Sequence, residues 1–304
     1  MNILMTGASG FLGSRIRSEL EGNHALTTLG RQTISQQHIR CDLVDETPQL
    51  KGYTFDVVIH AAGKAHAVPR TSQERGDYER VNVQGTVRLL TALEQLPVLP
   101  QAIVYISTVL AYGRSEGQLL DEKTSLDATD VYGLSKARAE ALVCAWGERT
   151  GVRVAILRLP LVAAREPTGN LAAMMNGLRR GYYVRIGDGA ACRSMVRADD
   201  VATVVLKAAA VGGTYNLTDG CHPSVYQLEE AMARLVGRNR IPTVPLGVAK
   251  AVANVGDGIN GLIGRRFPLD SMALRKLTSS LTFSDEAARQ HLDWNPRAVL
   301  DCFR

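Results

Sequence analysis

The stretch VYGLSKARAE (131–140) places a phenol and an ammonium group four residues apart, at Tyr132 and Lys136. In a helix, residues four positions apart project from the same face, so these side chains would be neighbours. A free tyrosine has a pKa near ~10 and is a poor base at neutral pH. A nearby ammonium group favours the phenolate and eases proton transfer. The pair therefore indicates acid–base chemistry, with a solvated surface pair as the alternative.

Two hydroxyl groups precede that helix, at the end of an apolar run. The run 102–107 predicts a buried strand that ends in Ser107, followed by Thr108. Ligands of open parallel sheets bind at the carboxyl ends of the strands, within reach of the helix that carries Tyr132. Successive strand side chains point to opposite faces, and the offset from the YG pair at 112–113 favours Thr108 over its neighbour. We expect Thr108 to orient a substrate oxygen.

A glycine-rich loop follows the first predicted strand and opens a predicted helix. In MTGASGFLG the glycines Gly7, Gly10 and Gly13 stand three residues apart. Such glycines let the backbone approach a pyrophosphate, and the first helical residues, Phe11 and Leu12, add amide donors and the positive end of the helix dipole. A tight turn without a ligand would need only one glycine. The loop therefore predicts a dinucleotide site.

The residue after the second strand bears on the cofactor. That strand ends LGRQ, so Arg31 stands where an acid commonly accepts hydrogen bonds from the adenosine ribose. An acid at this position would repel a phosphate, whereas a guanidinium group binds a phosphate well. The sequence thus favours NADP(H), with NAD(H) possible, unless Arg31 is an ordinary exposed arginine.

The third and fourth strands are followed by CDL and HAAG. Asp42, next to Leu43, could accept a hydrogen bond from the adenine amino group. Small residues after the fourth strand would let the backbone press against the cofactor; they are Ala61, Ala62 and Gly63. His60 ends a buried strand and is interpreted as a structural group. His66, on the polar loop, is the candidate for substrate contact.

Short apolar runs alternate with helical patterns over the first two-thirds of the chain. The predicted strands are Asn2–Thr6, Ala25–Leu29, Ile39–Cys41, Val57–His60, Ala102–Ser107, Val152–Leu157 and Thr214–Leu217. The longer helical patterns are Leu12–Leu20, Val81–Leu96 and Val131–Arg149. This alternation predicts an α/β fold, a doubly wound parallel (Rossmann) sheet with a smaller, mostly helical substrate domain. We expect the dinucleotide-binding domain to span 1–160 and 201–218, and the substrate domain 161–200 and 219–304.

Composition excludes several classes of protein. The 304 residues are 45% hydrophobic and 21% charged, with a net charge of +5 from scattered basic residues, which does not favour nucleic-acid binding. The five cysteines form no Cys-x-x-Cys, so neither a disulfide framework nor a metal site is expected. The segment VPLGVAKAVANVGDGINGLIG is too polar to span a bilayer, and no signal peptide precedes NILMTG. These features favour a cytoplasmic location.

The chain resembles the extended short-chain dehydrogenase/reductases that act on nucleotide sugars. The resemblance covers nearly the whole length, and its carriers are TGASGFLG, CDL, HAAG, VNVQGT, STVLAYG, YGLSK, LRLPLV, RSMVRADDVA and LDWNP. It implies that Tyr132 and Lys136 are catalytic, with Thr108, beside Ser107, polarising the substrate oxygen. It also implies that Lys136 holds the nicotinamide ribose and that the enzyme forms a homodimer through the helices 81–96 and 131–149.

Three further residues gain roles only from this resemblance. Asn82 would support the active site, Pro160 would pass near the nicotinamide carboxamide, and Arg193 would meet the nucleotide diphosphate of the substrate. The segment PLVAAREP departs from the family's PxxVYGP and leaves the neighbouring substrate contacts open. The acidic pair Asp199-Asp200 is interpreted as structural.

Dehydration, epimerisation and reduction share this scaffold. The family's dehydratases carry Asp-Glu after the active-site threonine, whereas this chain has Val109 and Leu110, which cannot transfer protons. Arg31 favours reduction, because a reductase must take up fresh NADPH. HAAGKAH, CRSMV and LTSSLTFS also resemble bacterial reductases of UDP-linked 4-keto-6-deoxy-N-acetylhexosamines in O-antigen assembly. A 4-epimerase stays open as the alternative, and a non-catalytic dinucleotide sensor is the alternative outside enzymes.

Overall fold

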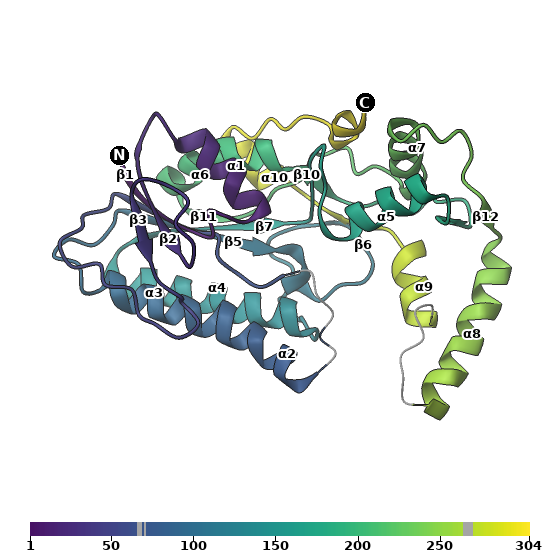
Figure 1. Cartoon of the computed structure of the whole chain (residues 1–304), viewed down its shortest axis with the longest axis horizontal. Helices are drawn as coiled ribbons and strands as arrows, with labels where there is room; N and C mark the ends of the chain where they lie inside the picture. Colours follow the sequence, from purple (N-terminus) through teal and green to yellow (C-terminus); the bar gives the residue numbers. More distant parts are fainter. Residues whose placement is uncertain (66–68, 70, 264–269) are drawn as a thin grey trace.

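A seven-stranded parallel sheet forms the centre of the larger part of the molecule (Figure 1). The computed structural model describes residues 1–65, 69, 71–263 and 270–304. The strand order is β11-β7-β5-β4-β1-β2-β3, and every neighbouring pair is parallel. The strands are β1 (Asn2–Thr6), β2 (Ala25–Gly30), β3 (His38–Arg40), β4 (Val57–His60), β5 (Ala102–Thr108), β7 (Arg153–Leu159) and β11 (Gly213–Asn216).

The predicted doubly wound fold is confirmed. β4 and β5 are buried at every residue, as their unbroken apolar runs require of strands covered on both faces. Strand ends differ from the sequence prediction by one or two residues: β3 begins at His38 and β7 continues to Leu159. Terminal strand residues are the least specified by hydrophobic pattern, because pairing with a neighbour decides them.

Helices cover the two faces of this sheet as separate layers (Figure 1). One layer holds α1 (Phe11–Leu20), α6 (Ala198–Val211) and α10 (Glu286–Leu292). Its apolar residues form one buried cluster with the sheet. The other layer holds α2 (Ser72–Tyr78), α3 (Gly85–Leu93) and α4 (Val131–Thr150). Apolar residues of α3 and α4 form a second buried cluster with the sheet. Two cores on opposite faces hold the strands, and hence the loops at their ends, in fixed register.

The predicted continuous helix 81–96 is wrong in detail. Residues Glu79–Gln84 form a π-helical segment, η1, between α2 and α3, and α3 itself ends at Leu93. A π turn inserts an extra residue per turn and often marks a functional position. Hydrophobic spacing does not report it, because the apolar positions on either side keep a helical period.

The remaining elements build a smaller, largely helical part. α5 (Gly169–Arg180), α7 (Val225–Leu235) and the 3-10 helix η3 (Val299–Phe303) share a third apolar cluster. α8 (Leu246–Ile263) packs with α9 (Ser271–Thr278). Three two-stranded ribbons join these helices to the sheet: β8 (Leu161–Ala163) with β10 (Met195–Arg197), β9 (Arg185–Ile186) with β12 (Thr243–Val244), and β6 (Gly117–Leu120) with β13 (Leu281–Phe283). The domain boundaries given above stay a prediction.

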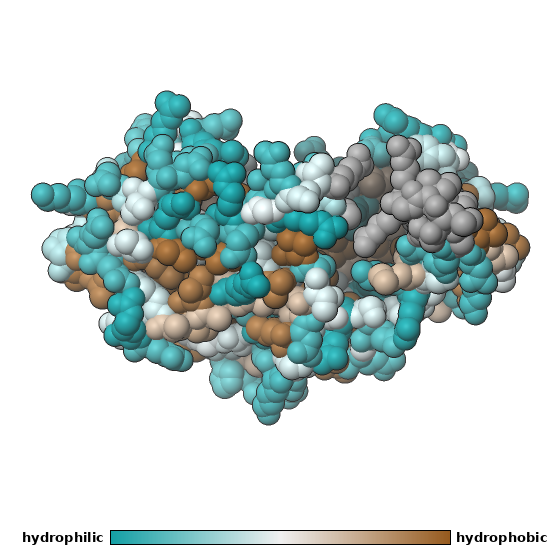
Figure 2. Space-filling view, turned by 90° about the horizontal axis from the view of Figure 1, so that it is seen from below, coloured by the Kyte–Doolittle hydropathy of each residue, from teal (hydrophilic) through white to brown (hydrophobic). Residues whose placement is uncertain are grey.

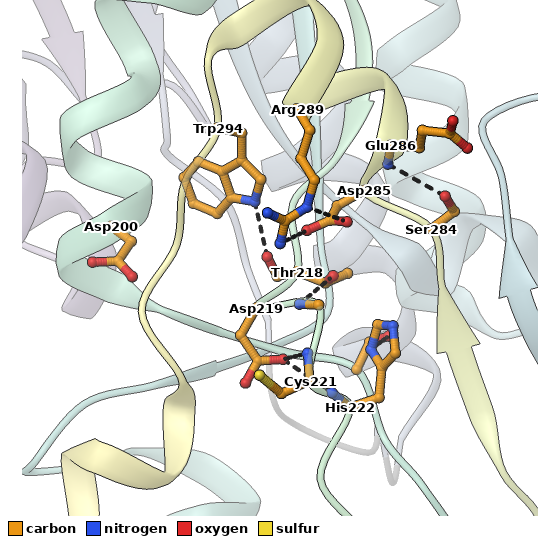
Figure 3. Close-up of polar contacts among 12 residues, drawn as sticks. Asp200, Thr218, Asp219, Cys221, His222, Ser284, Asp285, Glu286, Arg289 and Trp294 are labelled. Carbon is orange, nitrogen blue, oxygen red and sulfur yellow. Dashed lines mark hydrogen bonds and ion pairs between the residues drawn. The ribbon is translucent and has the colours of Figure 1, made fainter.

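A polar junction fastens the C-terminal segment to the end of β11 (Figure 3). Asp219 accepts hydrogen bonds from the backbone amides of Cys221 (3.0 Å) and His222 (3.2 Å) and, at its other oxygen, of Val299 (3.0 Å). Trp294 Nε1 donates to the carbonyl of Thr218 at 2.8 Å. These contacts join segments about 80 residues apart in sequence, so the junction is built for stability.

Asp200 and Asp199 lie on the first turn of α6. Asp200 is buried and accepts hydrogen bonds from the backbone amide and the guanidinium of Arg297, both at 2.7 Å from the nitrogen. Asp199 is half exposed and lies 3.7 Å from Arg15. Both carboxylates therefore have structural partners, as the sequence suggested.

All five cysteines are free thiols. Among the residues that the structure describes, no helix combines the length and the apolar character needed to cross a membrane.

Candidate active site

Three neighbouring strands deliver the predicted site residues to one edge of the sheet. β1, β4 and β5 lie side by side and parallel, so the loops that follow Thr6, His60 and Thr108 emerge together. The strand order reverses next to β1, which is the position where doubly wound sheets bind ligands. The fold therefore gathers the glycine loop, the HAAG segment and the hydroxyl-bearing strand end.

The glycine loop is shaped for close backbone approach. Gly7 has φ +71°, and a Cβ there would lie 2.5 Å from the backbone of Ala61. A Cβ on Gly13 would lie 2.0 Å from the carbonyl oxygen of Gly7. Both glycines are thus required by the chain itself, whereas a Cβ on Gly10 would meet nothing closer than 3.3 Å. Packing does not require Gly10, which caps α1 without a side-chain hydrogen bond, and the helix N-terminus stays open to an anion.

The loops after β2, β3 and β4 lie at the same edge. Arg31 is exposed directly after β2. Asp42 accepts a hydrogen bond from the amide of Val44 at 3.0 Å. The carbonyl of Leu43 accepts a hydrogen bond from the guanidinium of Arg88. The Ala62 amide donates to Thr6 Oγ1 at 3.2 Å. These contacts fix the loop backbones, and the predicted adenine and ribose contacts stay predictions.

Asn82 connects the HAAG loop to α4. Its Oδ1 accepts from the amide of Lys64 (2.7 Å), and its Nδ2 donates to the hydroxyl of Ser135 (2.8 Å) and the carbonyl of Lys64 (3.1 Å). A Cβ on Gly63 would lie 3.1 Å from Asn82 Oδ1. Only glycine therefore fits at position 63 without displacing the Asn82 side chain. Asn82 belongs to η1, and the π turn thus lies where the loop and α4 meet.

Tyr132 occupies the first turn of α4, where Asp130 caps the helix. Its ring lies 6.0 Å from that of Tyr78, centroid to centroid. Burial raises the pKa of Tyr132 to about 12, while a hydrogen bond with the Thr108 side chain acts in the opposite direction. The phenol is therefore held protonated, with the Thr108 hydroxyl as its direct partner.

Lys136 lies one turn further along α4 and is buried. Its Nζ donates to the carbonyl of Ile106 at 2.6 Å and lies 4.0 Å from the centre of the Tyr105 ring. Burial lowers the pKa of Lys136 to about 7, and the charge of Glu140 acts in the opposite direction. A lysine in this state is half protonated near neutral pH, which suits a group that takes part in proton transfer.

Ser107 lies apart from the Tyr132–Thr108 pair. Its hydroxyl donates to Glu140, two turns beyond Tyr132, and Glu140 forms a buried ion pair with Arg158 at 2.7 Å. The structure therefore does not bring Ser107 to the phenol. Both hydroxyls contact α4, because β5 ends at Thr108 and the chain then turns into the 3-10 helix η2 (Val109–Tyr112). That Thr108 rather than Ser107 faces the substrate oxygen stays a prediction.

The two histidines differ in what the structure says of them. His60 is buried and hydrogen-bonds to Thr6 Oγ1 (2.7 Å) and Thr86 Oγ1 (2.9 Å). Burial, aided by the charge of Lys136, lowers the pKa of His60 to about 3. It is a neutral structural group, as the sequence suggested. His66 lies outside the described residues.

Pro160 and Arg193 belong to the ribbon region beyond the sheet. Pro160 stands between β7 and β8. Arg193 donates to the carbonyls of Cys192 (3.2 Å), Ser279 and Lys276. Its guanidinium is therefore bound to the C-terminal end of α9 in this structure, and its predicted contact with a diphosphate stays a prediction.

Sequence reasoning missed several residues around the pair. Tyr78 packs against Tyr132, Ser135 links Asn82 to the Tyr132 carbonyl (2.8 Å), and Glu140 holds Ser107. The spacing of Tyr132, Lys136 and Glu140 could have placed Glu140 beside the site, because positions i, i+4 and i+8 share a helix face. No local pattern indicates Tyr78, which reaches the site through the fold.

Comparisons with known proteins show the family to which the chain belongs. The family model described as "NAD dependent epimerase/dehydratase family" matches residues 3–218. The N-acetyl-alpha-D-glucosaminyl-diphospho-ditrans,octacis-undecaprenol 4-epimerase of Escherichia coli O157:H7 is 24% identical over 95% of this chain and 88% of that protein. The GDP-6-deoxy-D-mannose reductase of Pseudomonas aeruginosa is 27% identical over 76% of this chain and 79% of its own.

A solved structure shares the fold. MoeE5 in complex with UDP-glucose and NAD superposes with a TM-score of 0.76 at 22% identity, covering 100% of this chain and 96% of that one.

Proposed function

Because the chain belongs to the NAD-dependent epimerase/dehydratase family, we propose that it reduces the 4-keto group of a UDP-linked 6-deoxy-N-acetylhexosamine in surface-polysaccharide assembly. The family relation makes it an NAD(P)-dependent enzyme and removes the sensor alternative. The named relatives act on sugars that carry a diphosphate, which supports that substrate class.

The residues at this edge of the sheet fit a nicotinamide dinucleotide. The open position at Gly10 and the uncapped end of α1 suit its pyrophosphate, and the lack of a Cβ at Gly63 lets the backbone pass close to Asn82. When bound, a reduced nicotinamide supplies a hydride to a carbonyl carbon. Thr108 would orient the carbonyl oxygen, Tyr132 would donate its proton to that oxygen, and Lys136 would support the phenol and hold the nicotinamide ribose.

The contact between Tyr132 and Thr108 supports chemistry at a carbonyl, because a hydroxyl beside a phenol can hold and protonate a carbonyl oxygen. Arg31 carries the choice of reduction, because its exposed guanidinium suits NADPH, which a reductase must take up afresh in each turnover. Dehydration would need a further acid and base beside Thr108. Val109 and Leu110 stand there on η2, and neither exchanges protons.

One assay tests the reaction. A UDP-4-keto-6-deoxy-N-acetylhexosamine is supplied with NADPH, and absorbance at the nicotinamide band is followed. We expect stoichiometric loss of NADPH and a product reduced at C4. No oxidation of NADPH with this substrate would reject the reductase.

A 4-epimerase is the second candidate. The Escherichia coli relative that aligns over 95% of this chain is named as a 4-epimerase of a lipid-linked sugar. The same Tyr132–Lys136 pair would serve, since an epimerase returns the hydride to the other face of the keto sugar. Interconversion of C4 epimers without added cofactor, on a nucleotide-linked or polyprenyl-linked N-acetylhexosamine, would establish this function.

Cofactor preference depends on Arg31. Its exposed guanidinium after β2 can pair with a 2′-phosphate, so we propose that NADP(H) binds more tightly than NAD(H). Arg31→Asp should lower the affinity for NADPH by a factor of roughly 10 to 100, as the loss of a charged hydrogen bond implies. The affinity for NADH should stay nearly unchanged. Equal affinities in the unmodified protein would contradict the preference. The homodimer through α3 and α4 is also a proposal, which a monomeric mass in light scattering would reject.

A further inference from the structure

A buried carboxylate lies one helical turn beyond Lys136. Glu140 is 4% exposed, and its position at i+4 on α4 places it on the same face of the helix as Lys136. The Nζ of Lys136 donates to the carbonyl of Ile106 in β5. Glu140 accepts a hydrogen bond from the hydroxyl of Ser107, the next residue of that strand. The ammonium group and the carboxylate thus lie on the same side of α4, against the same strand.

Arg158 holds the carboxylate of Glu140 in place. Its Nε, on a side chain of β7, lies 3.3 Å and 3.1 Å from the two carboxylate oxygens, and its Nη2 donates to one of them at 2.7 Å. The guanidinium is itself fixed by Tyr112, whose hydroxyl accepts from Nη1 at 3.0 Å. Both oxygens of Glu140 therefore accept hydrogen bonds, which fixes the position of its negative charge beside α4.

The other polar groups around Lys136 and Glu140 come from five elements; they are His60 on β4, Tyr105 on β5, Tyr132 on α4, Asn82 on η1 and Arg158 on β7. Burial lowers the pKa of the imidazole to about 3 and raises the pKa of both phenols above their ordinary value of 10.0, so these three groups are neutral at pH 7. The amide is neutral and the guanidinium is positive. Among the residues that the structure describes, Glu140 thus supplies the negative charge beside Lys136.

We propose that Glu140 is a positioning residue that acts through Lys136: it keeps the buried ammonium group charged beside the phenol of Tyr132. Arg158 and Ser107 fix the carboxylate in the place that this role requires. The role rests on the proposed function, in which a charged Lys136 supports proton transfer by Tyr132. The alternative is a purely structural role, because a buried ion pair also ties α4 to the sheet. The two roles differ in what a neutral isostere changes.

The first test needs no substrate. Glu140→Gln keeps the shape of the side chain and removes its charge, so Lys136 should lose its proton below its present pKa of about 7. Stability rises with pH wherever the unfolded chain binds a proton that the folded chain does not. Denaturant titrations between pH 6 and pH 7 should therefore give a steeper rise of stability in Glu140→Gln than in the unmodified chain. In the Lys136→Met background, Glu140→Gln should leave this slope unchanged.

The second test measures turnover against pH. If the charged ammonium group is required, kcat of the unmodified chain falls as pH rises through the pKa of Lys136, about 7. In Glu140→Gln this fall should occur about one pH unit lower, as the loss of a nearby opposite charge implies, and turnover at pH 5 should match that of the unmodified chain. Glu140→Asp keeps the charge but moves it, and its kcat should fall at a pH between the other two. A loss of turnover that is equal at every pH would assign Glu140 to the fold and overturn the proposal.

Glu148→Gln is the matched control. Glu148 lies two turns beyond Glu140 on α4 and is exposed. α4 belongs to the helical layer that faces the reader in the view from below, where hydrophilic residues lie among hydrophobic ones (Figure 2). Solvent screens an exposed charge there, so both measurements on Glu148→Gln should match those on the unmodified chain.

An unchanged slope in Glu140→Gln, or an equal change in Glu148→Gln, would overturn the proposal. If Glu140→Gln does not fold, Glu140→Asp takes its place: a smaller change in the same direction is expected, and an unchanged slope would overturn the role. If the unmodified chain reduces no keto sugar, the proposed function fails, while the stability slopes still decide whether Glu140 sets the charge of Lys136.

Discussion

The surroundings of Lys136 on α4 and of Asp219 at the junction are both polar and buried, yet the two charges are compensated to different extents. Asp219 is 3% exposed and receives three backbone amides, so its charge is fully compensated. Lys136 is 4% exposed and meets a single carbonyl and an aromatic ring. Burial lowers its pKa to about 7 and raises that of Tyr132 to about 12.

This contrast separates buried charged groups that stabilise the fold from those that destabilise it. A buried carboxylate with matched donors contributes to stability, whereas a buried ammonium group with a strongly lowered pKa opposes it. Buried residues that lower stability at the ligand-binding edge of a sheet are candidates for chemistry, because selection for stability alone would favour other residues there. The comparison predicts that substitutions on α4 change turnover, and those at the junction change unfolding.

The largest effect is expected from Tyr132→Phe. The substitution keeps the ring that packs against Tyr78 and removes only the hydroxyl. Turnover should fall by about 10²–10⁴-fold, as loss of a general acid does, while the melting temperature and cofactor affinity stay close to those of the unmodified chain. Steady-state kinetics and cofactor titration measure both. Near-normal turnover would remove Tyr132 from the mechanism and collapse the contrast between the two regions.

Thr108→Ala should have the next largest effect. It removes the hydroxyl that partners Tyr132, and turnover should fall by about 10²-fold, the loss typical of one positioned hydrogen-bond donor. Ser107→Ala is the matched neighbour. Since Ser107 donates to Glu140, its loss should mainly lower the melting temperature. The opposite ranking of the two turnover rates would show that Ser107 faces the substrate.

Asp219→Ala tests the other region. Three amides would lose their acceptor, and the free energy of unfolding should fall by about 2–3 kcal/mol, measured by denaturant titration. Turnover per folded molecule should not change. Glu116→Ala serves as the control, because its ion pair with Arg275 is exposed and should contribute within about 0.5 kcal/mol. A fall in turnover without loss of stability would place Asp219 in the catalytic machinery.

Sequence alone predicted what local pattern encodes. The parallel strands follow from apolar runs, the turn at Gly7 from its glycine, and the placement of Tyr132 and Lys136 on one helix from helical spacing. A direct contact between these two side chains stays a prediction. The family relation follows from the order of those motifs. These features depend on residues within a few positions of each other.

The rest depends on contacts between distant segments. Asn82 meets Ser135 across 53 residues, and the π turn that carries Asn82 leaves the apolar spacing unchanged. Arg193 binds carbonyls 83 and 86 residues away, which no motif announces. The direction of both pKa shifts on α4 arises from burial by the whole fold, and neighbouring charge alone had suggested an easily ionised phenol.

The smallest expected effect is a pH dependence of stability, and it tests the contrast most directly. The pKa of Lys136 is about 7 in the folded chain against an ordinary value of 10.5. Between these values the unfolded chain binds a proton that the folded chain does not, so this residue makes stability rise with pH there. Below pH 7 both states are protonated and the full destabilisation is present. The slope is at most about 1.4 kcal/mol per pH unit.

Lys136→Met isolates this contribution, because the other titrating groups remain in both proteins. Denaturant titrations between pH 7 and pH 10 should give a smaller rise of stability with pH in Lys136→Met than in the unmodified chain. Tyr132 does not interfere in this window: its pKa is raised from 10 to about 12, so its contribution is present below pH 10 and is lost only above it. Lys207→Met, at the exposed pair with Asp293, should leave the slope unchanged. Equal slopes in all three proteins would mean that Lys136 stays charged without lowering stability. Burial would then not distinguish the surroundings of Lys136 from the junction around Asp219.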